Sequence, residues 1–120
     1  MNKKNLSLST LACLLAALLT GCRSRGINIT LTNTGGQPIR NIELDYPGGT
    51  FGTPAIQPND SFHYRMKILG DGQMKLIFQE SDGREHHEKG PEVRAGDDGE
   101  MTVAIDKDGN NTWKANVQGK

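Results

Sequence analysis

Short segments in which apolar and polar residues alternate recur along the chain, and this period of two constrains the fold more than any other feature. The clearest example spans residues 61–68, where the apolar positions are Phe62, Tyr64, Met66 and Ile68. Successive side chains of a β-strand point to opposite faces of the sheet, so such a segment buries one face and leaves the other in water. The alternation therefore predicts β-strands rather than helices.

The same alternation returns in further segments that turn-forming residues separate. These segments cover residues 27–31, 42–46, 74–78, 101–105 and 113–117. Two less regular stretches complete the set: Thr50 to Ile56 contains glycine and proline, and Arg84 to Val93 is strongly polar. Because glycine, proline and clustered charge belong at sheet edges or in loops, we expect both stretches there.

Two details of the pattern predict local geometry. Ile39 is out of phase with the apolar positions that begin at Ile42, which predicts a β-bulge or bend near Arg40. The Gly-Asp-Gly run at residues 70–72 predicts a tight hairpin between the segments on either side, and the Asp-Gly pair at residues 82–83 predicts another.

Seven or eight short strands at a spacing of about 8–12 residues are typical of an all-β, antiparallel β-sandwich. We expect one such domain, with a small barrel as the alternative. In strand count it resembles immunoglobulin-like and transthyretin-like domains, although the Cys…Trp…Cys framework of antibody domains is absent. The alternating residues predict the core: Ile27, Ile29, Leu31, Ile42, Leu44, Tyr46, Phe62, Tyr64, Met66, Ile68, Leu76, Phe78, Met101, Val103, Ile105 and Trp113.

The first part of the chain has a different character. Lys3 and Lys4 precede an apolar stretch from Leu6 to Leu19 that only serines and a threonine interrupt. This layout is typical of a secretory signal peptide, and the stretch is short for a membrane-spanning helix. Hydrophobic residues make up 34% of the chain, and many of them lie here. Because no second long apolar run follows, a polytopic membrane protein is excluded.

The signal-like segment ends at residues 19–22 with the sequence Leu-Thr-Gly-Cys, which resembles the lipobox of bacterial lipoproteins. The resemblance implies cleavage between Gly21 and Cys22. It also implies a diacylglycerol thioether on the Cys22 sulfur and an acyl chain, such as palmitate, on the freed amine. The alternative is an ordinary cleaved signal, or an uncleaved one, in which Cys22 is incidental.

The resemblance also predicts where the protein resides. Two or three acyl chains hold a protein stably on a bilayer, so we expect attachment to a membrane of the cell envelope through Cys22. In the family, a residue other than Asp after the lipidated cysteine directs the protein to the outer membrane, facing the periplasm, in hosts with two membranes. That residue is Arg23. The expected parts are the signal peptide, residues 1–21; a lipidated tether, residues 22–26; and the β-sandwich, residues 27–120.

Cysteine and charge content exclude several classes of function. Cys13 leaves with the signal peptide and lipid consumes Cys22, so the expected mature domain has neither a disulfide nor a free thiol. Thiol catalysis and cysteine metal sites are excluded with them. The chain has 14 basic and 14 acidic residues without a basic cluster, so we expect no nucleic-acid partner.

Histidines and acidic turns are the remaining candidates for metal binding. His86 and His87 are adjacent, so on a strand they point to opposite faces and cannot both bind one metal unless the segment is a loop. A zinc site on a strand therefore needs His63 beside one of them, with a glutamate nearby. The acidic turns at residues 97–100 and 106–110 do not match an EF-hand loop. An exposed polar strand and ordinary turn chemistry explain both groups, so we predict neither a metal site nor a cofactor.

No catalytic motif stands out. Ser61 and Ser81 lack the Gly-x-Ser-x-Gly surroundings of a hydrolase nucleophile, and no glycine loop precedes a helix. We therefore expect a non-enzymatic lipoprotein that serves as a structural or protein-interaction module, with another envelope protein as partner. The alternative is a ligand- or metal-binding lipoprotein that uses His63 with His86 or His87, or the acidic turns.

Overall fold

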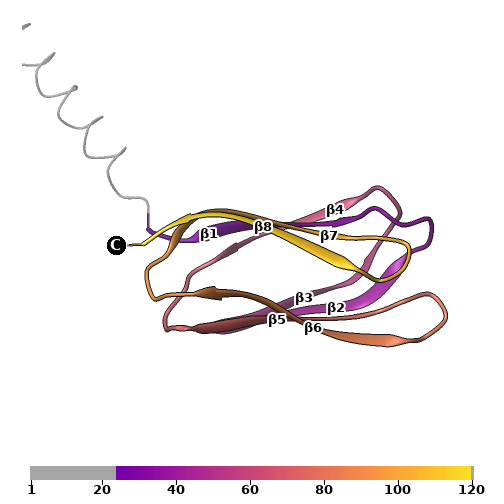
Figure 1. The fold of residues 1–120 in the computed structure, drawn as a ribbon, viewed down its shortest axis with the longest axis horizontal. Coiled ribbons are helices and arrows are strands. Elements are labelled where there is room, and N and C mark those ends of the chain that lie inside the picture. Colours follow the sequence, from indigo (N-terminus) through magenta and orange to yellow (C-terminus); the bar gives the residue numbers. More distant parts are fainter. Residues whose placement is uncertain (1–23, 120) are drawn as a thin grey trace, which may run out of the picture.

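A computed structural model describes residues 24–119, which form eight strands and contain no helix. The strands are β1 (Ile27–Asn33), β2 (Ile39–Tyr46), β3 (Gly49–Ile56), β4 (Ser61–Met66), β5 (Gly72–Gln79), β6 (Glu85–Val93), β7 (Asp98–Ile105) and β8 (Asn111–Gln118). They form two four-stranded sheets, β4-β1-β7-β8 and β3-β2-β5-β6, which Figure 1 shows as two layers. The predicted all-β sandwich is confirmed. In the described part of the chain, nothing helical is long and apolar enough to span a membrane.

The order of the strands departs from a simple succession of hairpins. β1 and β7 pair in parallel, with Ile29 beside Met101, whereas the other pairs are antiparallel. The prediction of a hairpin at residues 70–72 is wrong, because the chain crosses there from β4 in one sheet to β5 in the other. The hairpin predicted at residues 82–83 is confirmed, since β5 and β6 pair on either side of it.

The core lies between the two sheets. Its apolar side chains are all more than nine-tenths buried: Ile27, Ile29, Leu31, Ile39, Ile42, Leu44, Phe51, Ile56, Met66, Ile68, Met74, Leu76, Phe78, Val93, Met101, Val103 and Ile105. Most of these buried residues are the alternating apolar residues from which the sequence predicts the core. The prediction is wrong for Tyr64, which is 37% exposed because β4 lies at a sheet edge. Tyr46, Phe62 and Trp113 are only partly buried against this core.

The less regular stretches form edge strands, as predicted. β3 and β6 lie at the two edges of their sheet, and β4 and β8 lie at the edges of the other. Aromatic side chains close the gap between the sheets on both sides. Phe51 of β3 stacks on Tyr64 of β4 with ring centroids 3.9 Å apart. On the opposite side, Trp113 packs so closely on Gly90 that an added Cβ would lie 2.8 Å from the indole ring.

The bulge predicted near Arg40 is confirmed in β2. The register of β2 against β5 shifts between Arg40 and Glu43, and Asn41 adopts a φ of 49°. The extra residue restores the phase of the strand. Ile39 and Ile42 therefore both point into the core, with exposures of 5% and 3%.

The two ends of the sandwich carry different connections (Figure 1). The end where the described chain begins is called the proximal end, and it holds the β2–β3, β4–β5 and β6–β7 connections. The opposite end is called the distal end, and it holds the β1–β2, β3–β4, β5–β6 and β7–β8 connections. Both the start and the end of the described chain therefore lie far from the distal connections.

Candidate functional site at the distal end

The distal end contains a hollow of about 270 Å³ between three of its connections. Its walls come from the β1–β2 loop, the β5–β6 turn and the beginning of the β7–β8 turn. Side chains of both charges line it: Glu80, Asp82, Arg84, Asp106 and Lys107. Loops held by a rigid scaffold carry the binding residues of many proteins, so this hollow is the candidate site.

The side chain of Asn33 holds together the chain segments at the distal end. Its fully buried side chain donates from Nδ2 to the carbonyls of Gln37 and Ile56, at 2.8 and 3.0 Å. Its Oδ1 accepts from the N–H of Gly35 at 2.9 Å. These three bonds join the end of β1, the β1–β2 loop and the end of β3. The sequence pattern indicates only a turn after β1 and carries no signal of this burial.

Replacing Asn33 with alanine is expected to lower the free energy of unfolding by about 3 kcal/mol. Each buried polar group left without a partner costs roughly 1–3 kcal/mol, and the change removes all three bonds. Urea denaturation measures the loss. The matched control is Asn116→Ala on exposed β8, for which the expected change is within about 0.5 kcal/mol. Equal effects of the two changes would contradict this role of Asn33.

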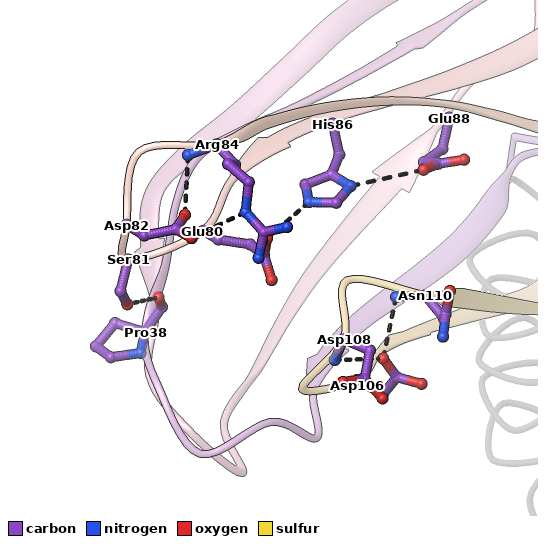
Figure 2. Close-up of polar contacts among 10 residues, drawn as sticks. All are labelled: Pro38, Glu80, Ser81, Asp82, Arg84, His86, Glu88, Asp106, Asp108 and Asn110. Atoms are coloured by element: carbon purple, nitrogen blue, oxygen red, sulfur yellow. Dashed lines mark hydrogen bonds and ion pairs between the residues drawn. The ribbon is translucent and has the colours of Figure 1, made fainter.

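Ion pairs fix the β5–β6 turn (Figure 2). The largely buried Glu80 carboxylate lies 3.0 Å from Nη2 of Arg84 and 3.0 Å from Nε2 of His86. Nε of Arg84 also donates to Oδ2 of Asp82 at 2.8 Å, and its backbone N–H donates to Oδ1 at 3.0 Å. The charged groups on this wall of the hollow therefore hold one another in place.

The Asp82 carboxylate is expected to titrate below the ordinary range of an aspartate. The backbone N–H of Arg84, and then its guanidinium, lower the pKa of Asp82. Since the pKa is lower in the folded than in the unfolded state, the contact stabilises the fold above about pH 4 and is lost as the pH falls through the folded-state pKa. The effect on stability is small for so exposed a pair.

Carboxyl NMR titration measures the pKa of Asp82 directly. In Arg84→Ala the pKa of Asp82 is expected to rise part of the way toward the ordinary value of an aspartate. The backbone bond to Asp82 remains in this variant, while the guanidinium is removed. An unchanged midpoint in that variant would show that the guanidinium does not act on Asp82.

His86 joins the two layers of the sandwich at this end. Its ring stacks on Phe78 of β5 with centroids 4.6 Å apart and an interplanar angle of 3°. On its other side lies Gly109 of the β7–β8 turn, which has a φ of 78°, and an added Cβ there would lie 2.6 Å from Cε1 of the ring. The ring therefore packs between the sheets, with one nitrogen on Glu80.

In the acidic turns, aspartate carboxylates accept hydrogen bonds from nearby backbone N–H groups. Oδ1 of Asp106 accepts from the N–H groups of Asp108 and Asn110, at 2.9 and 3.0 Å (Figure 2). At the proximal end, Oδ2 of Asp97 accepts from the N–H of Arg94 at 2.9 Å. Aspartate commonly forms such bonds in turns. Ordinary turn chemistry therefore accounts for their composition.

The three histidines do not come together. His63 lies on β4, where its Nδ1 is 3.0 Å from Oγ1 of Thr30. His86 and His87 lie on β6, at the opposite side of the sandwich, and His87 is exposed beside Glu85. The sequence-based combination of His63 with either one is therefore not formed. Across residues 24–119, no group of three or more histidine, cysteine and acidic side chains is placed to hold a metal ion.

The two serines considered as nucleophiles bond to residues of other strands and loops. Ser81 donates from its hydroxyl to the Pro38 carbonyl at 2.7 Å (Figure 2), and Ser61 lies 2.8 Å from the Thr32 hydroxyl. The Ser81 bond ties the β5–β6 turn to the β1–β2 loop across the hollow. The predicted cleavage and lipidation residues, Gly21 and Cys22, lie outside the described residues.

Comparison with known proteins supports a class of fold and nothing narrower. No family model matches the chain, and no curated protein matches it. Among solved structures, it is similar to an NMR structure of a protein from Eubacterium rectale, at 13% sequence identity and a TM-score of 0.55. The match covers 75% of this chain and 87% of that one. At this identity the likeness shows the fold alone, a small β-sandwich.

Proposed function

We propose that this chain is a bacterial lipoprotein of the cell envelope that anchors to a membrane through lipid on Cys22 and binds a partner protein with its distal end. The residues at the signal peptide's end support the anchor. In a host with two membranes, Arg23 after the lipidated cysteine favours the outer membrane, with the domain facing the periplasm. The β-sandwich is then a non-enzymatic interaction module.

The placement of the chain start relative to the hollow carries this proposal. The described chain begins at the proximal end (Figure 1), whereas the residues that line the hollow belong to the distal connections. A lipid two residues before Ser24 therefore orients the distal loops away from the membrane. Loops that a rigid scaffold presents in this way are common binding surfaces.

The distal loops suit a partner better than the edge strands β3 and β6 do. β3 contains Gly52 and Pro54, and β6 contains Gly90 and Pro91. Proline cannot donate to a β-ladder, and these residues are typical of edges protected against strand addition. Fixed ion pairs around the hollow instead favour a polar protein surface, with charge complementarity setting its orientation.

Photo-crosslinking in living cells tests the distal contact. A crosslinking amino acid at Gly36, where an added side chain meets open space, or at Lys107 is expected to give one discrete crosslinked protein. The control position is Lys114, an exposed residue of β8 away from the hollow. The same set of products from all three positions would overturn the distal contact.

A further inference from the structure

The start of the described chain is firmly bonded to the proximal end. Arg25 donates to three backbone carbonyls, those of Gly96, Gln118 and Gly119, at 2.6, 3.1 and 3.1 Å. This one guanidinium therefore joins the beginning of the domain to its last strand and to the β6–β7 connection.

The residues beside Arg25 are held as well. The N–H of Gly26 donates to Oδ1 of Asp98 at 3.0 Å, and Nη2 of Arg65 donates to the carbonyl of Ser24 at 2.7 Å. Ser24 to Gly26, expected from the sequence to be part of a tether, are thus bonded to the folded domain.

Little chain remains between the fold and the proposed lipid. Only Arg23 separates Cys22 from Ser24. An extended residue spans about 3.3–3.6 Å, so the two Cα atoms lie within about 7 Å of each other. Lipid on Cys22 therefore brings the proximal end itself to the bilayer surface.

An apolar side chain projects from this same end. Leu69, in the β4–β5 connection, is 64% exposed. Its position is fixed, because its N–H donates to the Pro47 carbonyl at 3.0 Å and its side chain packs against Gly48. Its exposure is therefore a property of the folded domain.

The charges around Leu69 suit a headgroup layer. Lys67 and Arg94 are exposed, and within residues 24–119 their side chains make no hydrogen bond or ion pair. The nearby carboxylates of Asp71 and Asp97 instead accept backbone N–H groups of the β6–β7 connection. The two cations are therefore available to lipid phosphates, while the two carboxylates keep their negative charge and are held against the backbone of the domain.

We propose that the proximal end is a membrane-docking surface, in which Leu69 enters the interface of the bilayer that carries the Cys22 lipid, and Lys67 and Arg94 contact its headgroups. The inference rests on the proposed lipid anchor. It goes further in assigning a second attachment and a fixed orientation, with the long axis of the sandwich rising from the membrane. Interfacial segments typically insert their apolar side chains about 5–10 Å into the headgroup region.

Depth-dependent fluorescence quenching tests the docking. The mature protein from an expressing cell carries an environment-sensitive NBD group at Leu69→Cys, or at Lys107→Cys on the distal end as the control. Each is reconstituted into vesicles of equal parts phosphatidylethanolamine and phosphatidylglycerol, with a lipid that bears a nitroxide near its headgroup. Quenching is expected to be several-fold stronger at position 69 than at position 107, with a blue-shifted emission.

The outcomes separate the docking from the anchor. Intact mass spectrometry of the same samples reports whether Cys22 carries lipid. Equal quenching at the two positions in lipidated protein would overturn the docking and leave the anchor standing. Protein without lipid on Cys22 would overturn the proposed anchor, and the docking with it. Because Leu69 and Lys107 are exposed, both variants are expected to fold, which circular dichroism verifies.

Discussion

Replacing Cys22 with alanine is expected to abolish incorporation of labelled palmitate. The thioether to diacylglycerol requires a sulfur nucleophile, and the expected mature chain has no other cysteine. Without that thioether the two or three acyl chains that bind a bilayer stably are lost. Metabolic labelling measures the change.

The other cysteine of the chain supplies the control. Cys13 lies within the proposed signal peptide, so Cys13→Ala is expected to leave the labelling unchanged. Labelling that persists in Cys22→Ala would place the lipid on another residue. Loss of labelling in Cys13→Ala alone would likewise contradict the assignment.

Replacing Phe78 with alanine is expected to lower the free energy of unfolding by about 3–5 kcal/mol. Phe78 is fully buried in β5, and its ring also stacks on His86 at the distal end. Small domains are stable by only about 5–15 kcal/mol, and with Cys13 and Cys22 both outside the sandwich no disulfide supports this one. Urea denaturation at neutral pH is the measurement.

Leu69→Ala is the matched control for Phe78→Ala. Both changes shorten an apolar side chain, but Leu69 is 64% exposed and Phe78 is 0% exposed. For the exposed position the expected change is within about 0.5 kcal/mol. If the two variants lost similar stability, the core would not be organised around β5 as described. A neutral result at Leu69 also leaves that residue free to act at the membrane.

The existence and edge positions of the strands follow from local sequence. Alternation identifies β1, β2, β5 and β7, whose apolar faces all point into the core. Glycine, proline and charge identify β3 and β6 as edges, and a single out-of-phase isoleucine identifies the bulge in β2. These features are predictable because each depends on residues that are neighbours along the chain.

Features that depend on distant residues do not follow from local sequence. Alternation reports which face of a strand is buried and carries no information on its partner, so the parallel pairing of β1 with β7 is not predictable. The Gly-Asp-Gly run at residues 70–72 has hairpin composition, yet it joins strands of different sheets. Tyr64 has the alternation of a core residue but becomes partly exposed because no strand covers that edge.

The candidate site shows the same division. Its turns are predictable from Asp-Gly and Gly-Gly pairs, whereas the contacts that shape it join separate connections. Asn33 bonds to the end of β3, and His86 packs between Phe78 and the β7–β8 turn. Burial of a polar residue such as Asn33 depends on partners that come from elsewhere in the fold, so no local pattern indicates it.

Intact mass spectrometry of the protein purified from the membranes of an expressing cell tests the lipid anchor most directly. A chain that begins at Cys22 and carries the added mass of a diacylglycerol group, with or without a further acyl chain, is the predicted result. A chain that retains residues 1–21, or one in which Cys22 is unmodified, would contradict both the anchor and the orientation inferred from it.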